Sequence, residues 1–164
     1  MTRPRSLLIL GGLALAIWGM THGLWYAVFA EHQAVGNIGG SLAASFAAAA
    51  ERNPAAIRAL LLTYKEAKYI YDRHVDVHSH WIGLAMLLIV LGIGFDRVNF
   101  SGRNQLVLGI ALLSGAVFFP LGVFLQTFSH GPAPRAFTVA GSALMIGALT
   151  GIMWGVAKDT PFSG

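Results

Sequence analysis

The residues of this sequence best suited to chemistry are its six histidines, because it contains no cysteine and few charged residues. His74, His78 and His80 lie close together, where a polar segment gives way to a long apolar one. His22 lies inside another apolar segment, and an ionisable side chain in such a place is by default a candidate for function. A neutral imidazole can ligate haem iron, zinc or copper, and it can also relay protons.

The composition is typical of a membrane protein. The chain has 164 residues, of which 55% are hydrophobic and 11% charged, and its mean hydropathy is +0.64. Soluble domains typically carry about 25% charged residues. The lack of cysteine excludes disulfides, thiolate metal sites and the attachment of c-type haem. The net charge of +4 is not gathered into a basic run, so we expect it to orient the chain in a lipid bilayer and not to bind nucleic acid.

We predict an all-α fold, an integral membrane four-helix bundle that forms a single membrane domain over residues 1–164. Each apolar segment is long enough to cross a bilayer, and the spans are expected at about 7–29, 77–95, 105–128 and 136–156. The first segment is interpreted as a span that is retained and not as a signal peptide.

Residues of about 30–76 are expected outside the bilayer as a helical hairpin. Gly36, Gly39 and Gly40 should break the backbone, and a short helix over 42–51 should follow them. The second arm of the hairpin continues into the second span. Asn53 is a good N-cap, Pro54 suits the first helical turn, and no glycine or proline follows before Gly83.

A single helix from residue 53 to 95 would be roughly 60 Å long, about twice the thickness of the bilayer core. The second span is therefore predicted to extend well beyond the bilayer.

All six histidines are predicted to lie at one face of the membrane. Four spans place both termini on one side, and residues 30–76 and the turn 129–135 on the other, where the histidines fall. Basic residues flank the short segments on the terminal side: Arg3, Arg5, Arg97, Arg103 and Lys158. By the positive-inside rule we expect cytoplasmic termini, an outward histidine-rich face and, in a bacterium, location in the inner membrane.

The first interpretation of the histidines is a site for b-type haem. Six-coordinate haem iron takes one imidazole from each side of the ring. His22 on the first span could face either His78 or His80 on the second, which project roughly 160° apart on a helix. The remaining imidazole could bind a second centre or a propionate, and Gln126 could hydrogen-bond a propionate or a quinone carbonyl. The alternative is that these side chains only make hydrogen bonds between helices.

The second interpretation is a copper or zinc site. His74 and His78 have the i, i+4 spacing that brings two imidazoles to one ion, although helices also produce such pairs by chance. Nearby nitrogen and carboxylate ligands could complete the site: His22, His32, Asp76 and His80.

The layout of His22 and the H-x-H of His78 and His80 on neighbouring spans resembles small four-helix membrane cytochrome b subunits. This resemblance implies haem b and electron transfer with a quinol or a soluble carrier at the outer face. Because every histidine is at one face, at most one membrane haem is implied. A third hypothesis is a cofactor-free accessory subunit, or a homo-oligomer, that packs against other membrane subunits through Gly147, Gly151 and Gly155.

Overall fold

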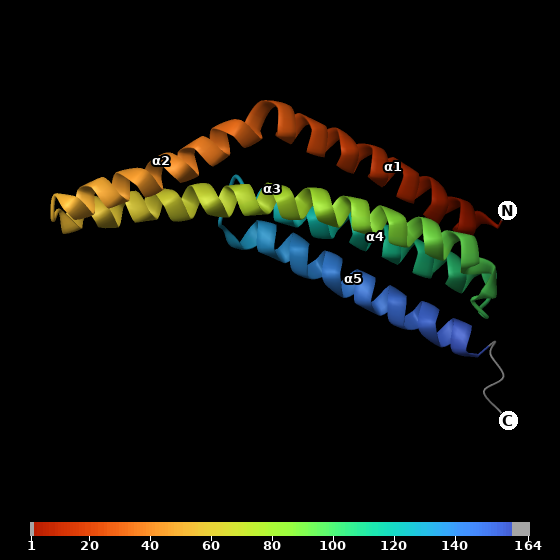
Figure 1. Ribbon diagram of the computed structural model, residues 1–164. Coiled ribbons are helices and arrows are strands. Elements are labelled where there is room, and N and C mark those ends of the chain that lie inside the picture. Colours follow the sequence, from red (N-terminus) through yellow and green to blue (C-terminus); the bar gives the residue numbers. More distant parts are fainter. Residues whose placement is uncertain (1, 159–164) are drawn as a thin grey trace, which may run out of the picture.

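The computed structural model of the chain describes residues 2–158, and its regular structure there is entirely helical. In chain order the elements are α1 (Arg3–Trp25), the π-helix η1 (Tyr26–Ala30), α2 (Glu31–Ala50), α3 (Pro54–Gly94), the 3₁₀ turn η2 (Phe95–Arg97), α4 (Gly102–Leu125) and α5 (Pro132–Ala157). Figure 1 shows the start of α1 and the end of α5 at the same end of the molecule.

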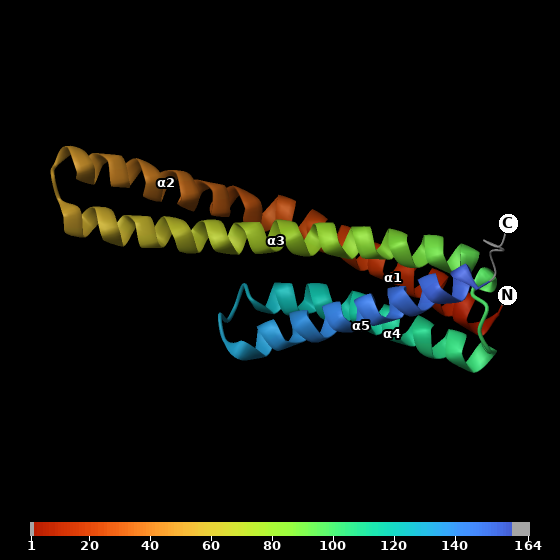
Figure 2. The same cartoon turned by 90° about the horizontal axis from the view of Figure 1, so that it is seen from below.

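α1, η1 and α2 form one helical rod that bends at η1 (Figure 1). The predicted break at Gly36, Gly39 and Gly40 is wrong, because α2 is helical through all three. A glycine inside a helix costs about 1 kcal/mol relative to alanine. Here α2 lies along α3 over its length, and we attribute the continuity of α2 to this packing (Figure 2).

α3 is the long helix that the sequence predicted. The Asn53 side chain accepts a hydrogen bond from the Ala56 amide at 3.1 Å, so it caps the helix as expected, and Pro54 occupies its first turn. The 41 residues of α3 correspond to about 62 Å of helix. Figure 2 shows the hairpin of α2 and α3 extending well beyond the loop that joins α4 to α5.

α4 and α5 pack most closely where glycines replace side chains. A Cβ atom built on Gly141 would overlap the backbone of Phe119, and one on Gly115 would lie 2.8 Å from the Gly141 carbonyl oxygen. In the glycine stripe proposed for contact with other subunits, Gly151 and Gly155 pack within the chain against Leu108, Val98 and Phe100, whereas Gly147 has open space around it.

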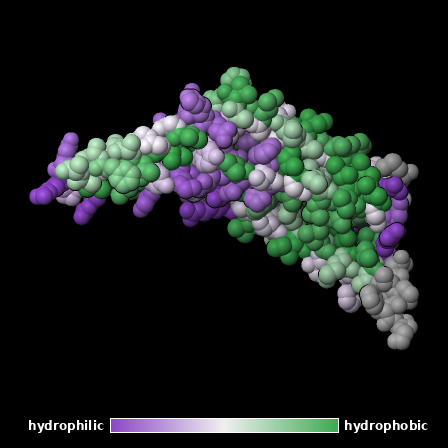
Figure 3. All heavy atoms as spheres, in the orientation of Figure 1, coloured by the Kyte–Doolittle hydropathy of each residue, from purple (hydrophilic) through white to green (hydrophobic). Residues whose placement is uncertain are grey.

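Four helical segments are long and apolar enough to cross a membrane: Arg3–Ala50, Pro54–Arg97, Gly102–Leu125 and Pro132–Ala157. Large apolar side chains are exposed on them, among them Leu10, Val90, Ile110 and Ile146. Figure 3 shows hydrophobic residues covering the half of the molecule near the ends of the chain, and hydrophilic residues gathered around its middle. A surface of this kind suits lipid and not water.

Candidate functional site

The two imidazoles that lie closest to each other are those of His22 on α1 and His74 on α3. His22 is buried, with 9% of its surface exposed, and its Nε2 lies 3.4 Å from Nδ1 of His74. The ring centroids are 5.5 Å apart and the ring planes differ by 18°. The facing nitrogens therefore lie near the line between the ring centres, and the two rings point at each other. Such a pair can share one proton.

Aromatic rings enclose this pair. Tyr26 stacks on His74 at a centroid distance of 4.5 Å, and Trp81 meets His22 edge-on at 5.2 Å. Trp25 and Phe124 lie 5.6–6.1 Å from the two imidazoles. We call His22, His74 and these four aromatic residues the imidazole pocket.

Two polar atoms in the imidazole pocket have no partner: Nδ1 of His22 and the hydroxyl of Tyr26 are buried and make no hydrogen bond within residues 2–158. Tyr26 is the first residue of the π-helix η1, a rare element that is often found at functional sites. Sequence reasoning missed Tyr26, since a π-helix leaves no clear signal in residue pattern.

His78 is held differently. Its Nδ1 lies 3.0 Å from the carbonyl oxygen of Gly19 on α1, and a Cβ on Gly23 would overlap its ring. A carbonyl oxygen only accepts, so Nδ1 carries the proton and neutral His78 keeps a free lone pair on Nε2. Nε2 makes no hydrogen bond within the described chain. Ligating histidines have this arrangement, in which the other ring nitrogen donates to a carbonyl or carboxylate.

His80 lies on the opposite side of α3, as the helical spacing predicted. Its ring contacts Phe119 of α4 at a centroid distance of 4.7 Å. His80 and His78 therefore contact different neighbouring helices, and neither is the imidazole closest to His22.

Gln126 links three helices. Its amide oxygen accepts a hydrogen bond from the hydroxyl of Tyr69 at 3.1 Å, and its amide nitrogen lies 3.1 Å from the Thr138 hydroxyl and 3.3 Å from the Gly122 carbonyl. These contacts join the C-terminal end of α4 to α3 and α5. Both polar ends of the side chain are thus engaged inside the chain.

The other residues considered for a metal site do not come together. His32 is exposed on α2, and Asp76 pairs with Arg73 at 2.9 Å. Nε2 of His130 lies 3.6 Å from a carboxylate oxygen of Glu66. Among residues 2–158, no group of three or more histidine, aspartate or glutamate side chains is placed to hold an ion.

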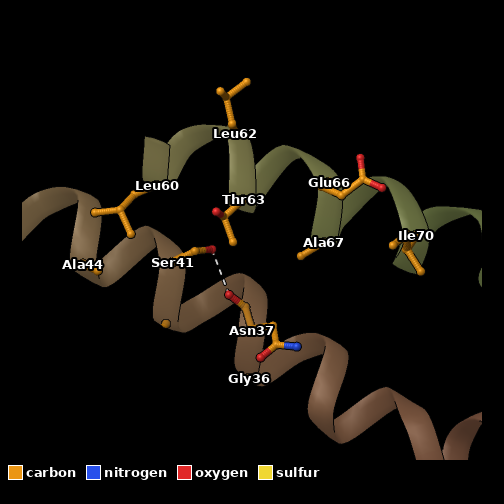
Figure 4. Close-up of a pocket in the computed structure, with 11 residues that line it drawn as sticks. Gly36, Asn37, Ser41, Ala44, Leu60, Leu62, Thr63, Glu66, Ala67 and Ile70 are labelled. Atoms are coloured by element: carbon orange, nitrogen blue, oxygen red, sulfur yellow. Dashed lines mark hydrogen bonds between the residues drawn. The ribbon is translucent and has the colours of Figure 1, made fainter. Parts of the chain in front are cut away.

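The hairpin of α2 and α3 contains a hollow of about 870 Å³. Figure 4 shows the Thr63 side chain of α3 pointing toward α2 near Ser41, and the Ser41 hydroxyl donates a hydrogen bond to the Asn37 carbonyl at 2.8 Å. Glu66 is the only charged residue of its lining, so this hollow has no cluster of ionisable groups that could do chemistry.

Comparison of the chain with protein-family models, curated proteins and solved structures finds no match. The fold and the site thus define a class and no family: an all-helical protein with four helices able to cross a membrane, and with imidazoles clustered between two of them.

Proposed function

We propose that this protein is an integral membrane subunit that binds b-type haem through His78 and transfers electrons at its histidine-rich face. The observation that carries the proposal is the bond between Nδ1 of His78 and the Gly19 carbonyl, which leaves Nε2 free as a ligand. Bound haem would supply one-electron redox chemistry. The contribution of the chain is to hold the His78 ring in the space beside Gly23 and to fix which nitrogen of the neutral ring carries the proton.

The space between His22 and His74 does not fit a haem. Trp25 lies 6.0 and 6.1 Å from the rings of His22 and His74, and Phe124 lies 5.6 and 6.0 Å from them. Both aromatic rings are thus nearly equidistant from the two imidazoles, and they fill the space that a macrocycle between the imidazoles would need. This argues for His78, and not His22, as the haem ligand.

His78 would be the one imidazole of this chain that holds the haem. A second copy of this chain or a neighbouring membrane subunit could supply a further ligand. The electron donor or acceptor would be a quinol or a soluble carrier at the outer face, if the termini are cytoplasmic as the positive-inside rule predicts.

An absorption spectrum of the detergent-purified protein, reduced minus oxidised, tests the proposal. We expect a Soret band that is lost in His78→Ala and kept in His22→Ala and in the control His32→Ala, because His32 is exposed on α2. A wild-type protein that shows no Soret band after expression with added haemin contradicts the proposal.

A second candidate is a copper or zinc ion between His22 and His74, favoured by their facing nitrogens 3.4 Å apart. Two metal–imidazole bonds of about 2.0 Å would need only a slightly wider separation. Metal analysis should then find an ion in the wild type and in His130→Ala, but not in His74→Ala. If neither haem nor metal is found, a cofactor-free accessory subunit of a larger membrane complex is the remaining hypothesis.

A further inference from the structure

The facing nitrogens of His22 and His74 are spaced like two ligands of one ion. Nε2 of His22 and Nδ1 of His74 are 3.4 Å apart. Hydrogen bonds from protein N–H groups to oxygen are about 2.7–3.2 Å long, so this contact is long for a hydrogen bond. Two metal–nitrogen bonds of about 2.0 Å, meeting at an angle of about 120–180°, would hold the nitrogens roughly 3.5–4.0 Å apart. The two rings would need to separate by only a few tenths of an ångström.

The imidazole pocket offers an ion two nitrogen ligands and no carboxylate. Its other members are aromatic, and His22 is nine-tenths buried among them. Among residues 2–158, no third histidine, aspartate or glutamate joins the pair to complete a set of ligands. The ion that fits must therefore accept two neutral nitrogens in an environment without a countercharge.

These requirements select the charge and the type of the ion. Zinc takes three protein ligands in catalytic sites and four in structural ones, and copper(II) prefers a tetragonal set of nitrogen and oxygen ligands. A divalent ion in the imidazole pocket would lack ligands and would bury two uncompensated charges, which is costly. Copper(I) carries a single charge and accepts two imidazole nitrogens as its only ligands.

We infer that the imidazole pocket binds copper(I) through Nε2 of His22 and Nδ1 of His74. The inference rests on the second candidate of the proposed function and deepens it, because it names the ion and its oxidation state. It does not depend on haem at His78.

A hollow of about 220 Å³ at the base of the hairpin reaches one ring of the pair. Tyr26 and His74 line it together with the side chains of Gln33 and Asn37. It shares three lining residues, among them Asn37, with the larger hollow shown in Figure 4, so the two hollows are continuous. The ion therefore approaches the pair from the hairpin.

The support of His22 indicates a loosely held ion. Histidines that bind a metal tightly donate their other ring N–H to an acceptor, and losing that acceptor typically weakens binding by about 10–100-fold. Nδ1 of His22 has no such acceptor among the described residues. An ion that is held loosely suits a site that takes up copper(I) and passes it on.

Anaerobic titration of the detergent-purified protein with copper(I), supplied as its acetonitrile complex, tests the inference. Trp25 and Trp81 lie 5.2–6.1 Å from the rings of the pair, so a bound copper ion should quench their fluorescence. We expect quenching that saturates at one ion per chain and that a large excess of Zn²⁺ does not reverse. His22→Phe and His74→Phe, which keep a ring of similar size, should bind at least about tenfold more weakly.

His32→Ala and His80→Ala are the matched controls, because His32 is exposed on α2 and His80 lies on the other side of α3. Both should titrate as the wild type does. Displacement of copper(I) by Zn²⁺, or a titration unchanged in both phenylalanine variants, overturns the inference.

X-ray absorption at the copper edge counts the ligands in the wild type, so it does not depend on the folding of any variant. Two nitrogen ligands are expected after the acetonitrile is washed out, and a spectrum with three or more overturns the inference. Zinc bound through His74 in place of copper(I) would leave the second candidate standing. The Soret band tests His78 separately, so each proposal can fail alone.

Discussion

At the scale of single residues, the same side-chain type has three different settings in this protein. His22 and His74 share one contact inside an aromatic enclosure, His78 is anchored to a backbone carbonyl, and His80 packs against a phenylalanine on the other side of α3. The chemistry open to each imidazole follows from which of its nitrogens is already engaged.

Gly23→Ala tests how closely His78 is seated. The added methyl group would overlap the imidazole and displace it from the Gly19 carbonyl. We expect a cost of about 1–3 kcal/mol in the free energy of unfolding, as for other overpacked sites. If His78 holds haem, the Soret band should weaken as well.

The control for that experiment is Gly83→Ala on α3, since a Cβ there meets nothing within 4 Å. It should be neutral or stabilise the protein by about 0.5–1 kcal/mol, because alanine is the better helix former. Equal effects of the two variants on thermal unfolding in detergent would show that His78 is not confined by Gly23.

At the scale of elements, the fold is two helix pairs joined along α3. α1 packs on α3 and α4 packs on α5, while α1 and α4 line an apolar hollow of about 540 Å³. The glycines of α4 and α5 permit close backbone contact within that pair.

Gly141→Ala should destabilise the pair of α4 and α5. Its methyl group would overlap the backbone of Phe119, which cannot move aside as a flexible side chain can. We expect a loss of about 1–3 kcal/mol. Gly147→Ala, on the same helix but with open space around it, should not destabilise the protein. The comparison is made by thermal unfolding of both variants in one detergent.

The start of α1 is tied to η2 by a carboxylate. Hydrogen bonds from Thr2 at 3.0 Å and from Arg5 at 2.9 Å lower the pKa of Asp96 below its ordinary value. A carboxyl with a lowered folded pKa stabilises the fold above its unfolded pKa, and this contribution disappears as the pH falls through the folded pKa.

We therefore expect Asp96→Asn to lower the unfolding midpoint at neutral pH and to match the wild type in strong acid. The difference should also shrink at high salt, because Asp96 is exposed and its ion pair with Arg5 is screened. Glu51→Gln serves as the control, because Glu51 is exposed and forms no ion pair with any of residues 2–158. If the unfolding midpoints of Asp96→Asn and the wild type differed by the same amount at every pH, the effect would not come from ionisation of Asp96.

At the scale of the whole molecule, four helices suited to a bilayer carry a hairpin that extends past the others (Figure 2). The ends of the described chain lie together at the start of α1 and the end of α5 (Figure 1), whereas His22, with His74 beside it, lies in the last turn of α1. If the chain crosses a membrane, the histidine-rich part and the ends of the chain lie on opposite sides of it.

The absence of cysteine makes this orientation easy to measure. Ser129→Cys, between α4 and α5, should react with a membrane-impermeant maleimide in intact cells. Ser101→Cys, between η2 and α4, should react only after the membrane is permeabilised. The reverse pattern would place the histidine-rich face in the cytoplasm, against the positive-inside prediction.

The sequence alone determined the helices and their lengths, because apolar periodicity, the Asn53–Pro54 start of α3 and the length of the apolar runs act locally. It also predicted that the histidines lie at one face of the bundle, and His22 and His74 do lie together. It misjudged α2, where packing against α3 outweighs the poor helix propensity of Gly36, Gly39 and Gly40.

Only the tertiary structure decided which imidazoles meet. The pairing of His22 with His74 depends on how α1 and α3 are rotated about their axes. If either helix were rotated by one residue, His22 and His74 would no longer face each other. The placement of Tyr26 beside them depends on the π-helix η1. These arrangements depend on packing between residues far apart in the chain. The local sequence pattern therefore does not predict them.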